Sequence, residues 1–215
     1  MSHLSADKGK VDFCLYLITD RRSLAPGQDL IATVRAALRG GVRAVQLREK
    51  DLSAAELYPL ARELRQLTEE FSAKLLINDR VDLALAVDAD GIHLGHHSLP
   101  IAVARELLGN QRLIGVSTHH PDEVHRAAAA GADFVTFGPV YATPSKLPYG
   151  SPIGLPPLAV VCADDALPVF ALGGVTAARL SELRAVGCTH IALIGAILQA
   201  VDPEVAARDL LRGIV

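Results

Sequence analysis

Short runs of β-branched and other apolar residues alternate with longer amphipathic segments along the whole chain. The short runs predict strands, and the segments whose apolar residues recur three and four positions apart predict helices. Strands are predicted over residues 15–20, 44–50, 74–80, 91–96, 113–119, 134–140, 168–174 and 190–197. Helices are predicted over residues 29–39, 53–71, 122–130, 176–186 and 203–213.

Three of the helices also have recognisable start signals. Ser53 precedes Glu56 by three positions, as in a capping box, and Asp122 and Thr176 stand where two later helices begin. Eight strand–helix units in 215 residues predict a (β/α)8 TIM barrel, an α/β fold that forms a single compact domain. A doubly wound open sheet is the alternative, but the opening strand lacks the Gly-x-Gly-x-x-Gly turn of that fold.

Composition agrees with one compact domain and excludes some classes of partner. Half of the residues are hydrophobic and the net charge is −3. No basic stripe exists to bind nucleic acid, and no apolar stretch approaches the ~20 residues that cross a bilayer. Residues 1–12 are predicted to be a flexible N-terminal segment and residues 13–215 the barrel. Cys14 and Cys188 lie in or beside apolar runs, which predicts reduced thiols and a cytoplasmic protein.

Polar and charged side chains gather at the C-terminal ends of the predicted strands. They are Asp20, Arg48, Lys50, Asn78, Asp79, His96, His97, Ser117, His119 and, after the sixth strand, Lys146. Each one alone has a structural explanation; Asp20 could cap the next turn, for example. Because the strand ends of a TIM barrel meet at its working face, their number favours a functional site there.

Two glycine-rich turns and one long loop indicate anion binding. "ALGGV" (171–175) and "IGAI" (194–197) close the seventh and eighth strands, where barrels often bind phosphate. The predicted phosphate-binding residues are Gly173, Gly174, Ile194 and Gly195. A tight βα turn would also require glycine. The loop over 140–155 carries Thr143, Ser145 and Lys146, whose hydroxyls and ammonium suit anionic oxygens.

With these motifs assembled, the chain resembles the thiamine phosphate synthase and TenI superfamily over nearly its whole length. The matching pieces are "YLITD", "QLREK", "INDRVDLAL", "GIHLG", "GVSTH", "GADFVTFGPVYATPSK", "ALGGV" and "IGAI". Synthases of this family join a pyrimidine diphosphate to a thiazole phosphate with Mg²⁺. They hold the metal with one aspartate after the third strand, which matches Asp79, and another after the fourth. The second position falls on Ser98, in "GHHS".

The serine decides which branch the resemblance favours. Mg²⁺ prefers carboxylate oxygens, and a hydroxyl brings no charge to neutralise a diphosphate. The resemblance therefore implies a TenI-like thiazole tautomerase, an isomerase that aromatises a carboxythiazole phosphate by proton transfer without a metal or other cofactor. His119, in "GVSTH", matches the histidine assigned acid–base catalysis in TenI.

The resemblance also implies roles for the other strand-end residues. Arg48, Lys50 and Lys146 are expected to contact anionic groups of the substrate. Asn78, Asp79, His96, His97, Ser117, Thr143 and Ser145 complete the predicted substrate-binding set. Adjacent strand residues face opposite sides, so at most one of the paired histidines is expected to face the pocket if the strand extends that far.

Two alternatives remain open at this point. The first is a thiamine phosphate synthase, which would use Mg²⁺ bound by Asp79. The second is a non-catalytic TenI-like binding or regulatory protein that retains a phosphate pocket. In each case the expected partner is a small thiazole phosphate, with no nucleic acid and no membrane. Small barrels of this family often pair, so a homodimer is a further expectation.

Overall fold

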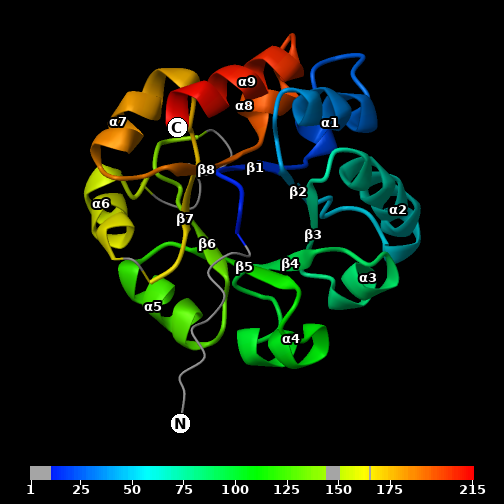
Figure 1. Ribbon diagram of the computed structural model, residues 1–215, viewed down its shortest axis with the longest axis horizontal. Coiled ribbons are helices and arrows are strands. Elements are labelled where there is room, and N and C mark those ends of the chain that lie inside the picture. The colour runs from blue at the N-terminus through cyan, green and yellow to red at the C-terminus, as the bar shows by residue number, and fades with distance from the viewer. Residues whose placement is uncertain (1–10, 144–150, 165) are drawn as a thin grey trace.

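The computed structural model describes residues 11–143, 151–164 and 166–215. Within them, eight parallel strands close into a barrel in sequence order, and helices surround it (Figure 1). The TIM-barrel prediction is confirmed. The prediction of a flexible segment over 1–12 stays a prediction, because residues 1–10 lie outside the described part of the chain.

The strands are shorter than the predicted apolar runs. They are β1 (Leu15–Ile18), β2 (Ala44–Leu47), β3 (Lys74–Asn78), β4 (Gly91–Leu94), β5 (Leu113–Thr118), β6 (Phe134–Phe137), β7 (Val169–Leu172) and β8 (His190–Leu193). The predicted last strand, 190–197, is wrong beyond Leu193. Its remaining apolar residues form a short helix that buries Ile197 and Leu198.

The helices follow the strands and differ from the predicted segments in several places. They are α1 (Leu30–Arg39), α2 (Ala54–Glu70), α3 (Val81–Ala86), α4 (Ile101–Leu108), α5 (Pro121–Ala129), α6 (Leu155–Ala163), α7 (Leu180–Ala185), α8 (Gly195–Leu198) and α9 (Pro203–Ile214). The predicted capping box at Ser53 and Glu56 is present. The segment predicted as one helix over 176–186 is a 3-10 turn, η3 (Ala177–Arg179), followed by α7.

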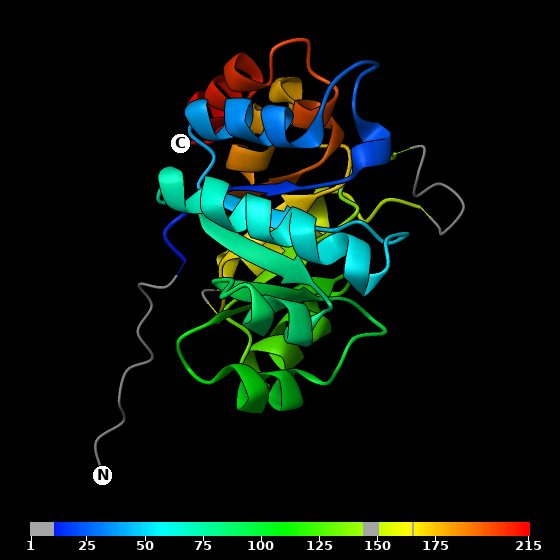
Figure 2. The same ribbon diagram turned by 90° about the vertical axis from the view of Figure 1, so that its right-hand side faces the viewer.

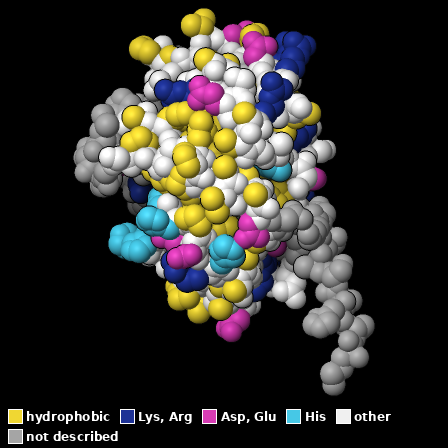
Figure 3. All heavy atoms as spheres, turned by 90° about the vertical axis from the view of Figure 1, so that its left-hand side faces the viewer, with side chains coloured by type: hydrophobic (Ala, Val, Ile, Leu, Met, Phe, Trp, Pro, Cys, Tyr) yellow, Lys and Arg dark blue, Asp and Glu magenta, His cyan; other side chains and the backbone are white. Residues whose placement is uncertain are grey.

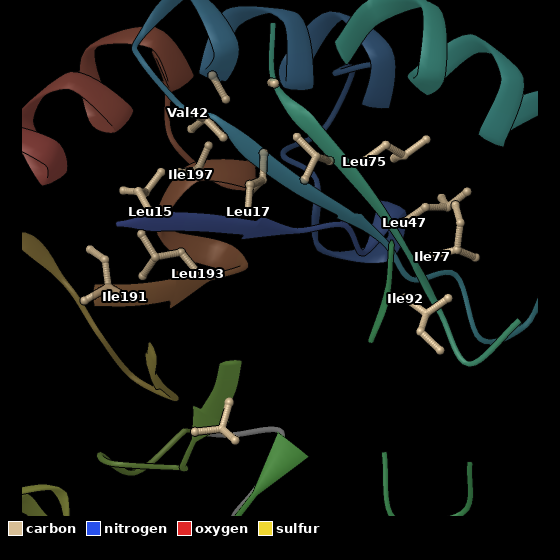
Figure 4. Close-up of a cluster of buried hydrophobic side chains, with 14 of the residues drawn as sticks. Leu15, Leu17, Val42, Leu47, Leu75, Ile77, Ile92, Ile191, Leu193 and Ile197 are labelled. Carbon is tan, nitrogen blue, oxygen red and sulfur yellow. The ribbon is translucent and has the colours of Figure 1, made fainter. Parts of the chain in front are cut away.

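Hydrophobic side chains form two layers, one on each side of the strands. The outer layer lies between strands and helices and includes Leu15, Leu17, Leu75 and Ile191 (Figure 4). In the view from the side, α1 and α2 lie against this outer surface (Figure 2). The inner layer fills the barrel itself and consists of Phe13, Tyr16, Ile18, Ala44, Leu76, Leu113, Phe134, Phe170 and Ala192. The interior of the barrel is therefore filled by a packed core.

Two matching arginine–aspartate pairs join helices to the N-terminal ends of strands. Asp90 accepts hydrogen bonds from the Leu75 N–H (2.8 Å) and from Arg65 of α2 (2.5 Å). Asp133 accepts from the Ile114 N–H (2.7 Å) and from Arg105 of α4 (2.6 Å). In a TIM barrel this end serves stability. These two pairs therefore hold α2 and α4 against the barrel.

Candidate active site at the C-terminal end of the barrel

The site takes its side chains from alternate positions along each strand. Inward-facing residues recur at every second position of a strand. Toward the C-terminal end of the barrel, the inward-facing positions that follow the inner layer are Gln46 on β2, His93 on β4, Ser117 on β5 and Thr136 on β6. The same alternation carries on to Arg48, one residue past β2. Polar residues thus replace the aromatic layer as the barrel approaches its working face.

Asp79 and Ser98 come together at this face although they are 19 positions apart. The Ser98 hydroxyl donates to Oδ1 of Asp79, and the Gly95 N–H donates to Ser98 Oγ at 2.6 Å. Asp79 Oδ2 accepts a hydrogen bond from the Asn78 side-chain amide at 2.7 Å. The hydroxyl therefore stands beside the carboxylate at the place where the resemblance expects a second metal-binding carboxylate.

The backbone at Asp79 has a left-handed conformation, with φ at +60°. Asp and Asn adopt this region more readily than most residues do. Neither Asn78 nor Asp79 caps the helix that follows, α3. The N-cap of α3 is Arg80, which makes no side-chain capping bond, and Asp79 directs its carboxylate to Ser98 and Asn78.

His96 and His97 lie in a turn, so the expectation based on strand alternation does not apply. Strand β4 ends at Leu94, and the Ser98 N–H donates to the Gly95 carbonyl at 3.2 Å, which closes the turn. Both imidazoles are exposed, and their ring centres are 5.0 Å apart. The glycine at 95 and the serine at 98 favour this turn over a longer strand.

His119 follows β5 and is held by a backbone contact across the next strand. Its Nδ1 lies 2.5 Å from the Gly138 carbonyl oxygen, so Nδ1 carries the hydrogen and donates it. The His119 N–H donates to the carboxylate of Glu123 in α5 at 2.6 Å. The His119 side chain is exposed. The structure thus places His119 at the working face.

A buried polar group inside the barrel was missed by the sequence analysis. His93 is 3% exposed, and its Nε2 lies 3.1 Å from Ser117 Oγ and 3.4 Å from Thr136 Oγ1. Its Nδ1 is buried without a hydrogen-bond partner among the described residues. Nearby, Gln46 donates to the Tyr16 hydroxyl at 2.8 Å. A histidine in the middle of an apolar strand run, "GIHLG", was the signal that could have located this group.

The pKa of His93 gives a prediction for the dependence of stability on pH. Burial lowers this pKa from 6.5 to about 3, and the positive charge of Arg48 also lowers it, while Asp79 opposes the shift. Between these values the unfolded chain binds a proton that the native chain does not, so stability is full above pH 6.5 and falls as the pH drops toward 3. One such proton changes the free energy of unfolding by about 1.4 kcal/mol per pH unit.

We therefore expect His93→Gln to reduce the acid sensitivity of the protein. Urea unfolding of both proteins at pH 7, 6 and 5 measures it. The free energy of unfolding should fall less steeply with decreasing pH in the variant. Equal slopes in the two proteins would show that His93 titrates normally in the native state.

The predicted phosphate-binding turns lie at the ends of β7 and β8. Gly173 and Gly174 have φ angles of +96° and +67°, which side-chain-bearing residues rarely adopt. A Cβ at Gly173 would come within 2.6 Å of Pro139, so glycine is also required by close packing. Gly195 begins α8. Both structural and phosphate-binding roles suit these glycines, and their contact with phosphate stays a prediction.

The remaining predicted residues divide into three groups. Asp20 caps the 3-10 turn η1 (Arg21–Ser23), accepting from the Arg22 N–H at 3.2 Å, so the structural interpretation of this residue holds. Arg48 is half-buried and Lys50 exposed at the working face, and Thr143 lies in the loop after β6. Ser145 and Lys146 fall outside the described residues.

A buried carboxylate supports the segment between Arg48 and Lys50. Glu49 is 5% exposed and accepts from the Arg21 N–H at 3.1 Å and from the Arg21 side chain at 3.2 Å. Arg21 also pairs with Asp51 at 2.5 Å. This contact, which the sequence analysis missed, fixes the backbone from which both cations project.

Fold and site together define the class of protein: a TIM-barrel protein whose working face carries the Asp79 carboxylate, the cations Arg48 and Lys50, and glycine-rich turns. A family model described as "Thiamine monophosphate synthase" matches residues 15–197, and the chain belongs to this family. The resemblance to the superfamily is thus confirmed.

Individual relatives are similar over most of the chain. A putative thiamine-phosphate synthase of Geobacter sulfurreducens is 58% identical, covering 94% of each chain. A thiamine-phosphate synthase of Synechocystis is 46% identical over 92% of this chain, which spans only 56% of that longer protein. Among solved structures, a thiamine phosphate pyrophosphorylase of Pyrococcus furiosus has a TM-score of 0.85, with 37% identity over 96% of each chain.

These relatives correct the choice of branch. The prediction of a TenI-like tautomerase, and with it of an isomerase, is wrong, because the similar proteins are named as synthases. The argument from Ser98 required two protein carboxylates at the metal. Mg²⁺ in proteins is commonly held by one or two carboxylates together with substrate phosphates and water, so one missing carboxylate does not exclude it.

Two further expectations concern partners. Among the described residues, no helix combines the length and apolar character needed to cross a membrane. Hydrophobic side chains gather on the face that carries α6, where Val160 is 59% exposed (Figure 3). The homodimer nevertheless stays a prediction.

Proposed function

We propose that this chain is a thiamine phosphate synthase, a transferase that couples hydroxymethylpyrimidine diphosphate with a thiazole phosphate. The bond between the pyrimidine methylene and the diphosphate breaks, and the thiazole nitrogen bonds to that methylene. The products are thiamine phosphate and pyrophosphate. The observation that carries the proposal is the pairing of Asp79 with Ser98 at the working face of a chain whose relatives are named as synthases.

The donor set at Asp79 suits Mg²⁺ bound largely through the substrate. The described residues contain no cluster of three or more His, Cys, Asp or Glu side chains able to hold a metal. One exposed carboxylate with an adjacent hydroxyl fits a cation that retains water and takes further oxygens from a diphosphate. Asp79 and Ser98 would hold it. When bound, Mg²⁺ neutralises the charge of the departing diphosphate.

The other residues of the face bind and orient the two substrates. We assign Arg48, Lys50 and Lys146 to the diphosphate, since fixed cations offset charge that develops as it leaves. Asn78 positions the Asp79 carboxylate through its amide. Ser117, whose hydroxyl is fixed by His93, and Thr143 are assigned to polar contacts with substrate. The turns at Gly173–Gly174 and Ile194–Gly195 are assigned to the thiazole phosphate.

His119 has a different role in this reaction. Coupling transfers no proton from a ring carbon to an exocyclic carbon, so the acid–base role predicted for a tautomerase is withdrawn. Its ring, fixed on Gly138, instead forms part of the wall around the substrates. His96 and His97 lie on an exposed turn and receive no role.

Direct assay of the coupling reaction tests the proposal. The purified protein is mixed with both phosphorylated heterocycles, and thiamine phosphate is measured as its fluorescent thiochrome derivative. We expect product in the presence of Mg²⁺ and none with EDTA. Absence of product from folded protein at any Mg²⁺ concentration would refute the function.

Substitution of Ser98 tests the position of the cation. Ser98→Asp adds a second carboxylate beside Asp79, so we expect the Mg²⁺ concentration for half-maximal rate to fall roughly tenfold. Ser98→Ala should raise it only a few-fold, because it removes a neutral ligand. A Mg²⁺ titration that is the same for all three proteins would place the cation elsewhere.

A further inference from the structure

Arg179 is not one of the strand-end residues described above, but its side chain contacts the Gly173–Gly174 turn. It ends the 3-10 turn η3, five residues after Gly174. Its Nη1 donates to the Gly174 carbonyl at 2.5 Å, and its guanidinium carbon lies 4.2 Å from the centre of the Tyr141 ring. The side chain is half-buried, so its charge is held in one place between the turn and the ring.

Tyr141 ties the loop after β6 to the same turn. Its backbone N–H donates to the Gly173 carbonyl at 3.0 Å, and its hydroxyl donates to Glu182 of α7 at 3.2 Å. Burial, followed by the hydrogen bond to Glu182, raises the pKa of Tyr141 to about 12. The hydroxyl thus stays protonated near neutral pH and remains a donor to the carboxylate.

The hydrogen bonds from the Tyr141 N–H to the Gly173 carbonyl and from Arg179 to the Gly174 carbonyl fix the direction of two backbone N–H groups. In a planar trans peptide the carbonyl and the following N–H point in opposite directions. With the Gly173 carbonyl turned toward Tyr141, the Gly174 N–H points away from it. With the Gly174 carbonyl turned toward Arg179, the Val175 N–H points away from that side chain. Without these contacts the two glycines could rotate more freely than any other residue pair.

We propose that Arg179 is a positioning residue that, together with Tyr141 and Glu182, orients the N–H groups of Gly174 and Val175 toward the phosphate of the thiazole substrate. The proposal rests on the function proposed above. Arg179 itself bonds to protein, and it acts on the substrate through the turn. Glycine is required at 174 for the same arrangement, because a Cβ there would lie 2.8 Å from Tyr141 and 3.0 Å from Arg179 Nη1.

Steady-state kinetics with each substrate varied separately tests the role. Because a small displacement of binding groups has a large effect on affinity, Arg179→Ala should raise KM for the thiazole phosphate by roughly 10–100-fold. The variant should lose binding of the thiazole phosphate equally in the ground state and the transition state. We therefore expect kcat, and the KM for the pyrimidine diphosphate, to change less than about threefold. Arg179→Lys should rescue only part of the effect, since an ammonium lacks the planar fork that both donates and stacks.

Arg184→Ala is the matched control, because Arg184 lies on α7 and is exposed. It should leave all constants unchanged. Loss of kcat together with equal increases in both KM values for Arg179→Ala would indicate general structural damage and overturn the proposal. So would an unchanged KM for the thiazole phosphate.

Binding of inorganic phosphate and amide hydrogen exchange separate this proposal from the function. In Arg179→Ala we expect the affinity for inorganic phosphate, measured by calorimetry, to fall by the same roughly 10–100-fold factor by which KM for the thiazole phosphate rises. We also expect the Tyr141 amide hydrogen to exchange faster. If the wild type binds phosphate in this way but forms no thiamine phosphate, the proposed function fails and the role of Arg179 stands. If wild type and variant bind phosphate equally, or neither binds it, the role of Arg179 is refuted.

Discussion

Asp79→Asn should lower kcat/KM for Mg²⁺-dependent coupling by about 10²–10³-fold. A loss of that size corresponds to roughly 3–4 kcal/mol of transition-state stabilisation, the range expected when a metal is weakened at a leaving group. The effect should be large because the neighbouring Ser98 supplies a hydroxyl and no second charge. Excess Mg²⁺ should restore part of the activity, since the substituted site still has oxygen ligands.

The asparagine substitution isolates charge from structure. Asn adopts the left-handed backbone conformation of this position at least as readily as Asp, so the turn should be retained. Asp82→Asn is the control, because the carboxylate of Asp82, in α3, pairs with Arg80 at 2.5 Å. It should change the rate less than about threefold. A rate for Asp79→Asn within tenfold of wild type, with Mg²⁺ still required, would assign the metal to other groups.

Phe134→Ala should reduce the free energy of unfolding by about 3–5 kcal/mol, a large part of the 5–15 kcal/mol typical of a domain. Phe134 is fully buried inside the barrel. Its ring centre lies 5.2 Å from Phe170, 5.4 Å from Tyr16 and 5.8 Å from Phe13, so truncation leaves a cavity that three aromatic rings cannot easily fill. Urea unfolding measures the loss.

Phe71→Ala is the matched control for this prediction. Phe71 follows the end of α2 and is only partly buried against the outer layer, so the same deletion should cost less. An unchanged dependence of unfolding free energy on urea would show that both variants unfold from the same compact state. A loss below about 1.5 kcal/mol for Phe134→Ala would mean that the inner layer repacks.

The choice between branches shows where local sequence reasoning failed. Position 98 was located correctly, and Ser98 does lie against Asp79. The error was to treat the protein as the only source of metal ligands, although a diphosphate substrate brings its own oxygens. Relatives named as synthases supplied the information that the charge argument alone lacked.

The sequence by itself determined the barrel, the strand ends that carry polar groups, and the superfamily. These follow from local periodicity, capping residues such as Ser53 and Glu56, and short motifs, all of which act between neighbours in the chain. Only the tertiary structure decided that His93 reaches Ser117, that Asp79 meets Ser98, and that Arg179 holds Gly174. Barrel closure sets these contacts, because side-chain direction and strand register become fixed only when all eight strands pair.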